Sequence, residues 1–190
     1  MEELLVKKQL FTVEEYMDME INADYKHEFH DGEITTIPGG TINHSTIGGN
    51  VFATLKFKLK NNPCKAFNSD MAIAINDFRY VYPDVSIVCG KPIMGILNKN
   101  AIQNPALIIE VLSEGTANYD SGDKFRKYRG IESLKEYVLI DQEHFLVEIY
   151  SKLEDNHWDL RVFNNEDDMM PLQSIDTQIS MQEIYEEVDF

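Results

Sequence analysis

Apolar residues in the first third of the chain recur at the spacing of a helix face. From Ile47 to Leu59 one returns every four residues, so we predict a helix over about residues 43–60 with one apolar face. Nearer the start, Thr12 and Glu15 have the spacing at which a hydroxyl and a carboxylate cap a helix reciprocally, and that helix is predicted to end near Glu20. Two more helices are predicted, one over about residues 120–130 and a short one capped by the sequence Ser180-Met181-Gln182-Glu183.

Extended segments are rich in β-branched and aromatic residues and are separated by polar turns. They predict strands over residues 70–75, 80–89, 106–112, 136–141, 145–150 and 158–163. Segment 106–112 hardly alternates between apolar and polar residues, which is typical of a strand buried on both faces. The Asp31-Gly32 dipeptide between two short extended runs predicts a tight hairpin with positive φ at the turn.

These elements indicate a mixed α/β protein whose central strands lie between two helices, rather than a repeating strand-helix-strand chain. The chain has 190 residues, and 43% of them are hydrophobic, which suffices for a sizeable core. No internal repeat, low-complexity tract or Gly/Ser linker divides it. We therefore predict one folded domain over residues 1–190.

The composition also indicates the cellular compartment of the protein. The first residues are acidic where a signal peptide is basic, and no apolar run approaches the roughly 20 residues of a membrane span. The two cysteines, Cys64 and Cys89, form no C-x-x-C pair and cannot build a disulfide framework. We therefore expect neither secretion nor membrane insertion, and a reducing cytoplasm as the compartment.

The net charge of −16 argues at first against nucleic acid, because phosphate binding calls for a basic surface. The charge is unevenly distributed. Residues 34–135 carry 12 basic and 8 acidic side chains, whereas residues 1–33 carry 3 and 10, and residues 136–190 carry 2 and 15. The acidic ends are interpreted as solvated surface, and the basic middle leaves nucleic acid open as a partner.

Two lone carboxylates stand in apolar surroundings. Asp84 follows Pro83 before a predicted strand, and Glu110 lies within the apolar segment 106–112. A buried carboxylate has to be protonated, paired with a cation or coordinated to a metal, because its isolated charge is costly. If the two strands are neighbours, both acids point at one place, and two carboxylates with water are what Mg²⁺ accepts when it acts on a phosphate. The spacing alone leaves the alternative open that Asp84 ends a strand and Glu110 pairs with a core cation.

An ordered set of motifs adds to this interpretation. They are His27-Glu28-x3-Gly32-Glu33, Pro83-Asp84, Pro105-x4-Glu110-Val111-Leu112-Ser113 and Asp120-x3-Lys124-x3-Tyr128. Together they resemble the Uma2 (DUF820) family of endonucleases in the PD-(D/E)xK nuclease superfamily, over about residues 12–185. The resemblance implies a restriction-endonuclease-like fold, a mixed central sheet flanked by helices, with Asp84 and Glu110 as ligands of Mg²⁺ or Mn²⁺. It also implies hydrolysis of phosphodiester bonds in DNA.

The sequence departs from the superfamily motif at one position. The motif lysine follows the second acid by two residues, and here that residue is Leu112. A side chain from another element can orient the attacking water if its tip reaches the same place. Lys124 is the candidate, as in members of this family where the lysine has moved to the following helix, and Lys127 is its rival. The alternative is a surface pair between Lys124 and Asp120.

The resemblance further suggests Glu28 as a third carboxylate near the metal, against the alternative of an exposed hairpin acid. Basic side chains could follow a nucleic-acid backbone, and the candidates are Lys127, Arg129, Lys56 and, at the start of the long helix, His44. For the lysines and arginine the alternative is a solvated helix face, and for His44 it is a capping or core role.

Two functions remain at this point. One is a metal-dependent endonuclease; the other is a catalytically inactive protein with a nuclease fold that binds nucleic acid or a protein partner, in which Leu112 marks a real loss. An ammonium group of Lys124 or Lys127 within hydrogen-bond reach of the carboxylates favours catalysis. Cleavage of a duplex by a one-site protein would require two copies, which suggests a homodimer.

Overall fold

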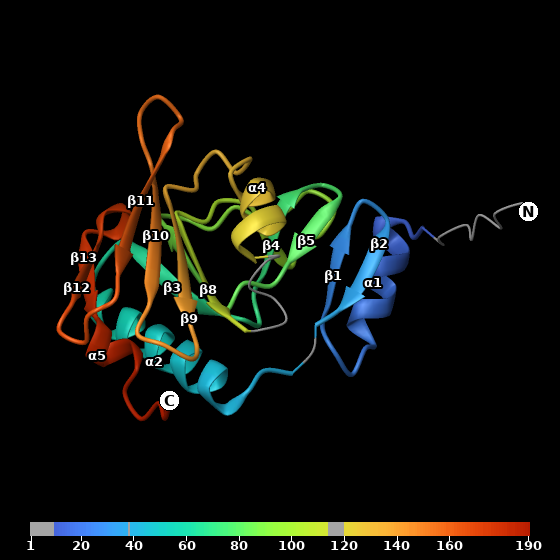
Figure 1. The fold of residues 1–190 in the computed structure, drawn as a ribbon. Coiled ribbons are helices and arrows are strands. Elements are labelled where there is room, and N and C mark those ends of the chain that lie inside the picture. Colours follow the sequence, from blue (N-terminus) through green and yellow to red (C-terminus); the bar gives the residue numbers. More distant parts are fainter. Residues whose placement is uncertain (1–9, 38, 114–119) are drawn as a thin grey trace, which may run out of the picture.

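The computed structural model describes residues 10–37, 39–113 and 120–190 (Figure 1). Its helical elements are α1 (Val13–Ile21), α2 (Ile42–Lys58), the π-helical turn η1 (Asp120–Lys124), α4 (Phe125–Tyr128), the 3₁₀ turn η2 (Gln173–Ile175) and α5 (Met181–Ile184). Its strands are β1 (His27–His30), β2 (Glu33–Thr36), β3 (Cys64–Asn68), β4 (Ala72–Asn76), β5 (Arg79–Val81), β6 (Val85–Cys89), β7 (Ala101–Ile102), β8 (Leu107–Leu112), β9 (Glu136–Asp141), β10 (Val147–Lys152), β11 (Trp158–Phe163), β12 (Met169–Leu172) and β13 (Thr177–Ser180).

The central sheet has six strands in the order β11-β10-β9-β8-β6-β3. β8 and β9 run parallel and the other neighbours run antiparallel, so the sheet is mixed. Its two faces belong to separate apolar clusters. One contains the buried face of α2 and the C-terminal segment, and the other contains Phe125 and Tyr128 of α4. The predictions of a mixed α/β fold and of a β8 strand buried on both faces are therefore confirmed.

A second sheet, β2-β1-β5-β4-β7, lies beside the first, and α1 covers it. The hydroxyl of Thr12 accepts a hydrogen bond from the Glu15 amide, and the Glu15 carboxylate accepts one from Thr12, which confirms the predicted reciprocal cap. The β1-β2 hairpin turns at Asp31 (φ 51°) and Gly32 (φ 98°), as the Asp-Gly dipeptide predicted. This hairpin places Glu28 on a strand next to β5.

The structure corrects the prediction of one long strand over residues 80–89. Residues 82–84 leave the ladder and separate β5 from β6, and the two strands belong to different sheets. Pro83 cannot donate a ladder hydrogen bond, so a strand is readily interrupted there. The break carries Asp84 to the start of β6, at the junction of the two sheets. The short strands β3, β7, β12 and β13 were not predicted, and the helix expected over 120–130 begins as a π-helical turn and ends at Tyr128.

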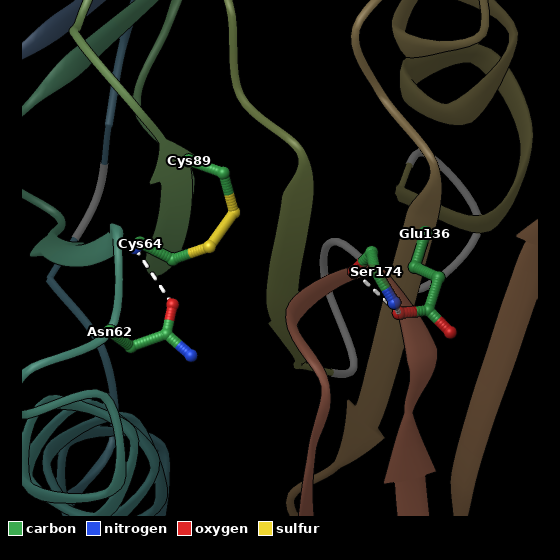
Figure 2. Close-up of a disulfide and its surroundings, with 5 residues drawn as sticks. All are labelled: Asn62, Cys64, Cys89, Glu136 and Ser174. Atoms are coloured by element: carbon green, nitrogen blue, oxygen red, sulfur yellow. Dashed lines mark hydrogen bonds between the residues drawn. A yellow bond between two sulfur atoms is a disulfide. The ribbon is translucent and has the colours of Figure 1, made fainter.

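The cysteines are a second correction. Cys64 on β3 and Cys89 on β6 face each other in the antiparallel register and form a disulfide (Figure 2). They stand 25 residues apart in the sequence, so only the pairing of the two strands brings them together. The argument for a reducing compartment from cysteine usage therefore loses its basis. Among the described residues, no helix is long and apolar enough to cross a membrane.

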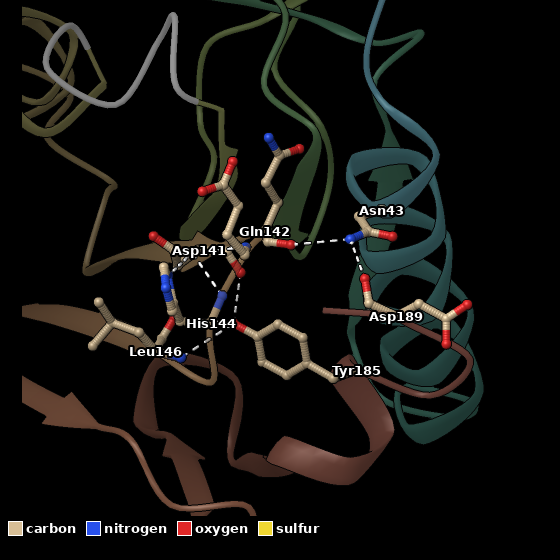
Figure 3. Close-up of polar contacts among 8 residues, drawn as sticks. Asn43, Asp141, Gln142, His144, Leu146, Tyr185 and Asp189 are labelled. Atoms are coloured by element: carbon tan, nitrogen blue, oxygen red, sulfur yellow. Dashed lines mark hydrogen bonds and ion pairs between the residues drawn. The ribbon is translucent and has the colours of Figure 1, made fainter.

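The C-terminal segment holds the beginning of α2 in place (Figure 3). The Asn43 amide donates to the backbone oxygens of Asp189 at 2.8 Å and Gln142 at 3.4 Å. The Tyr185 hydroxyl donates to the oxygen of Asp141 at 2.7 Å. The two bonds of Asn43 tie the first turn of α2 to Gln142, in the loop after β9, and to Asp189 in the C-terminal segment. His44 is the next residue of this turn, so its backbone position is fixed by the same bonds.

Candidate active site

The two lone carboxylates stand side by side on neighbouring strands. β6 pairs with β8 so that Val85 faces Ile109, and this register continued by one residue sets Asp84 opposite Glu110. Oδ2 of Asp84 accepts a hydrogen bond of 2.7 Å from the amide of Val111. Asp84 is thus tied to the strand that carries Glu110.

Lys124 reaches Glu110 and a further carboxylate, Glu28, from the turn before α4. Its Nζ lies 2.9 Å from Oε1 of Glu110 and 3.4 Å from Oε1 of Glu28. The lysine side chain is only 7% exposed, so a surface position is excluded. The side chain of Asp120, the alternative partner, lies outside the described residues. A buried ammonium group therefore lies in direct contact with both Glu110 and Glu28.

Glu28 belongs to the same cluster and is not an exposed hairpin acid. It is 8% exposed, and its Oε2 lies 3.0 Å from Nε2 of His30 on the same face of β1. Burial alone would raise the pKa of Glu28, but the hydrogen bond with His30 and the charge of Lys124 outweigh it and lower the pKa. Glu28 is thus held as a carboxylate.

Lys127 contacts His30, which in turn contacts Glu28. Its Nζ is 3.4 Å from Nδ1 of His30, whose other ring nitrogen contacts Glu28. Of the two rival lysines, Lys124 contacts Glu110 and Glu28 directly, and Lys127 contacts His30.

Tyr128 is a member of the site whose role sequence reasoning missed. The residue is fully buried, and its hydroxyl donates a hydrogen bond of 2.9 Å to Oε1 of Glu110. Burial, followed by the negative charge of Glu110, raises the pKa of Tyr128 well above its usual value, so the hydroxyl stays a donor. The available signal was its spacing, because a residue four positions after Lys124 lies on the same face of a helix.

His44 approaches Asp84 from the other side. Its Nε2 lies 3.4 Å from Oδ2 of Asp84, and its side chain is 23% exposed. The cap of α2 is made by the Thr41 hydroxyl, which accepts from the backbone amide of His44. The histidine ring is thus neither a cap nor part of the core; it lines a cavity of about 650 Å³ that opens beside Asp84.

Two of the predicted nucleic-acid contacts lie away from this cluster. Lys56 is in the last turn of α2, twelve residues after His44 and so about 18 Å further along the helix, at 1.5 Å per residue. Its ammonium lies 5.4 Å from the centre of the Phe52 ring. The exposed Arg129 follows Tyr128, and its guanidinium lies 5.2 Å from the centre of the Phe125 ring.

The oxygen donors suit a hard divalent cation such as Mg²⁺, because Asp84, Glu110 and Glu28 are all carboxylates. Within the described part of the chain, no three His, Cys, Asp or Glu side chains already stand in a metal-binding arrangement. The charge of Glu110 and Glu28 is balanced by the ammonium of Lys124 instead. The donor set thus fits a divalent metal in kind, with Lys124 at its edge.

Comparison with known proteins shows the family to which the chain belongs. The model of the Uma2 family, described as "Putative restriction endonuclease", matches residues 13–182. The chain is 38% identical to the uncharacterized protein sll1609 of Synechocystis sp. over 151 residues, which are 79% of this chain and 85% of that protein. It is 34% identical to the uncharacterized protein slr1290 of the same organism over 178 residues, 93% of this chain and 92% of the other.

A solved structure has the same fold. The crystal structure of a putative nuclease belonging to DUF820 from Anabaena variabilis superposes with a TM-score of 0.75 at 18% sequence identity, covering 92% of this chain and 97% of the other. The mixed sheets and flanking helices are therefore those of the restriction-endonuclease-like fold. With a family match over nearly the whole length, the chain belongs to the Uma2 family.

Proposed function

We propose that this protein is a divalent-metal-dependent endonuclease that hydrolyses phosphodiester bonds of DNA, with a site of the PD-(D/E)xK kind. The observation that carries the proposal is the position of Lys124, whose ammonium lies 2.9 Å from Glu110 and 3.4 Å from Glu28. A lysine beside the metal-binding acids is what the motif requires, and the strand itself offers only Leu112.

Asp84 and Glu110, with Glu28 beside them, would hold Mg²⁺ or Mn²⁺. Such an ion, when bound, neutralises charge on the phosphate and lowers the pKa of a water. The protein's own contribution is position. The Val111 amide fixes Asp84, the Tyr128 hydroxyl fixes Glu110, and His30 fixes Glu28. Each carboxylate is thereby held in one orientation before a ligand arrives.

Lys124 is the group that would act on the attacking water. A buried ammonium donates hydrogen bonds and carries the positive charge that offsets the negative charge developing on the phosphate. Leu112 stands where the motif has its lysine, and Lys124 would supply the ammonium from the turn before α4 instead. The chemistry requires the ammonium at the right place, whichever element carries it.

The first experiment is a calorimetric titration of the protein with Mn²⁺ and Mg²⁺. Saturable binding is expected for the wild type and its loss for Asp84→Ala/Glu110→Ala, with Asp84→Asn/Glu110→Gln as a pair that preserves side-chain volume. The matched control, Glu143→Ala/Glu154→Ala, removes two exposed acids elsewhere and should bind as the wild type does. Equal weak binding in all variants would overturn the catalytic proposal and leave a nuclease-fold protein that binds nucleic acid or a protein.

The second experiment measures cleavage of labelled DNA in the presence of the bound metal. Lys124→Ala is expected to lower kcat by about 100-fold or more, the size of effect of one acid-base group, while calorimetry still detects the metal. Lys91→Ala, which changes an exposed lysine after the end of β6 opposite Asp84, is the control and should keep full activity. Full activity of Lys124→Ala would exclude the lysine from catalysis. For any substrate in which both strands are cut, a homodimer is part of this proposal, because one chain supplies one site.

A further inference from the structure

The cavity beside Asp84 is separate from the cluster around Lys124. It has a volume of about 650 Å³, and its wall includes Asp84 and His44 on one side and residues just before β1 on the other. A volume of this order is typical of pockets that enclose a small ligand. Because the cavity begins at a proposed metal ligand, what fills it lies next to the bond that is cleaved.

Three aromatic rings contribute to the wall of this cavity. Tyr25 is 70% exposed, and the half-buried rings of Phe52 and Tyr82 also contribute to its wall. Lys26 lies beside them, with its Nζ 5.8 Å from the centre of the Tyr82 ring and 2.6 Å from Oδ1 of Asp70, so its charge is paired. The argument for a base therefore rests on the rings, because aromatic side chains stack the bases of single-stranded nucleic acid with little dependence on sequence.

The helix side of the cavity is unusually bare. Gly48 and Gly49 lie in the interior of α2 and line the cavity, although a glycine destabilises a helix relative to alanine. Packing does not require them, since a β-carbon at either position would meet no other atom within 4 Å. Neither has a positive φ. Because these two residues have no side chains, the cavity extends up to the backbone of α2, and a ligand can approach that backbone closely.

We propose that this cavity holds an unpaired nucleotide of the DNA strand that is cleaved, so that the substrate is single-stranded or locally unpaired DNA rather than continuous duplex. The inference rests on the proposed nuclease function and adds the substrate class. In a duplex each base is stacked and paired, and it reaches a protein cavity only after it leaves the helix. A strand with an unpaired base can place that base between the rings while its phosphate lies at Asp84.

The test compares three labelled DNAs of one sequence: a single strand, a perfect duplex and a duplex with an unpaired bulge. Cleavage with Mg²⁺ or Mn²⁺ gives kcat and KM, and fluorescence anisotropy in EDTA gives Kd without turnover. We expect the single strand and the bulged duplex to be cleaved at least about tenfold faster than the perfect duplex, as the cost of unpairing a base predicts. Equal or faster cleavage of the perfect duplex would overturn the proposal.

Two variants probe the cavity itself. Gly49→Leu fills it and is expected to raise KM and Kd for the single strand about tenfold or more, with an unchanged or higher Tm because leucine favours the helix. Its control, Ala53→Leu, adds a similar side chain one turn away on an exposed position of α2. Tyr25→Ala removes a stacking ring and should weaken binding about 5- to 100-fold. Its control is Phe57→Ala, an exposed ring outside the cavity.

The outcomes separate the two proposals. If no DNA is cleaved under any metal condition, the nuclease function fails, while anisotropy in EDTA still reports on the cavity. If DNA is cleaved but Gly49→Leu and Tyr25→Ala behave like their controls, the nuclease function stands and the cavity is not the nucleotide site.

Discussion

The hydroxyl groups of Ser86 and Ser174 differ in whether they have a hydrogen-bond partner. Ser86 on β6 is fully buried, and among the described residues its hydroxyl has no hydrogen-bond partner. Ser174 is the opposite case, because its hydroxyl donates a bond of 2.6 Å to Oε2 of Glu136. A buried hydroxyl without a partner costs free energy of folding, and one with a carboxylate partner stabilises the fold. Ser86 lies two residues after Asp84 and so on the same face of the strand.

The two serines therefore predict opposite effects of one substitution. Ser86→Ala should leave the free energy of unfolding unchanged or raise it by up to about 1 kcal/mol, whereas Ser174→Ala should lower it by about 1–3 kcal/mol. Urea denaturation of both variants measures the difference. A loss for Ser86→Ala as large as for Ser174→Ala would mean that the Ser86 hydroxyl is satisfied in the native protein.

At the scale of elements, the carboxylate of Glu136 joins the hairpin of β12 and β13 to the central sheet. Glu136 begins β9 and is 2% exposed. Its Oε2 accepts from the amide of Ser174 at 2.9 Å, and its Oε1 accepts from the amide of Gln173 at 3.2 Å and the hydroxyl of Ser151 at 3.2 Å (Figure 2 shows the contact with Ser174). These amides begin the turn η2 between β12 and β13, so the carboxylate caps that turn and ties it to β9.

Glu136→Gln is expected to lower the free energy of unfolding by about 2–4 kcal/mol, because one acceptor becomes an amide donor that faces other donors in a buried place. Urea denaturation measures it, with Glu143→Gln, an exposed acid without this role, as the matched control. Equal stability of the two variants would contradict the capping role of Glu136.

At the scale of the whole molecule, salt is expected to have opposite effects on the stability of the fold and on the proposed binding of DNA. The net charge is −16, and residues 136–190 alone carry 15 acidic and 2 basic side chains. Repulsion among like charges destabilises the compact state, and salt screens it over about 10 Å at 0.1 M. The proposed DNA binding would depend instead on contacts between basic side chains and phosphates, and salt weakens such contacts.

Raising the KCl concentration should therefore raise Tm and weaken DNA binding in the same buffer. Thermal denaturation and anisotropy measure the two effects. The control carries Glu154→Lys and Glu166→Lys, two exposed acids of the C-terminal region, and its Tm should rise less with salt. A Tm that falls with salt would show that favourable ion pairs, rather than repulsion, dominate the surface.

Features that depend on neighbouring residues were determined by the sequence alone. The capping spacing at Thr12 predicts α1, the Asp-Gly dipeptide predicts the β1-β2 hairpin, and the unbroken apolar run predicts a buried β8. The lone carboxylates Asp84 and Glu110 could also be recognised, because a charge in an apolar segment needs a compensating partner wherever the segment lies. These predictions succeed because backbone preference and burial act within a few residues.

Only the tertiary structure decided which partners meet. Lys124, Glu28 and Tyr128 come from separate elements, and their contacts with one another and with Glu110 depend on how α4 and β1 pack against β8. The sequence favoured Lys124 through a resemblance and kept Lys127 as its rival, since both lie on one short helical segment and only the packing determines which ammonium reaches Glu110 and Glu28. The Cys64–Cys89 pair likewise required the β3-β6 register. A side chain's partners across the fold depend on distances of a few ångströms between elements, which no local pattern encodes.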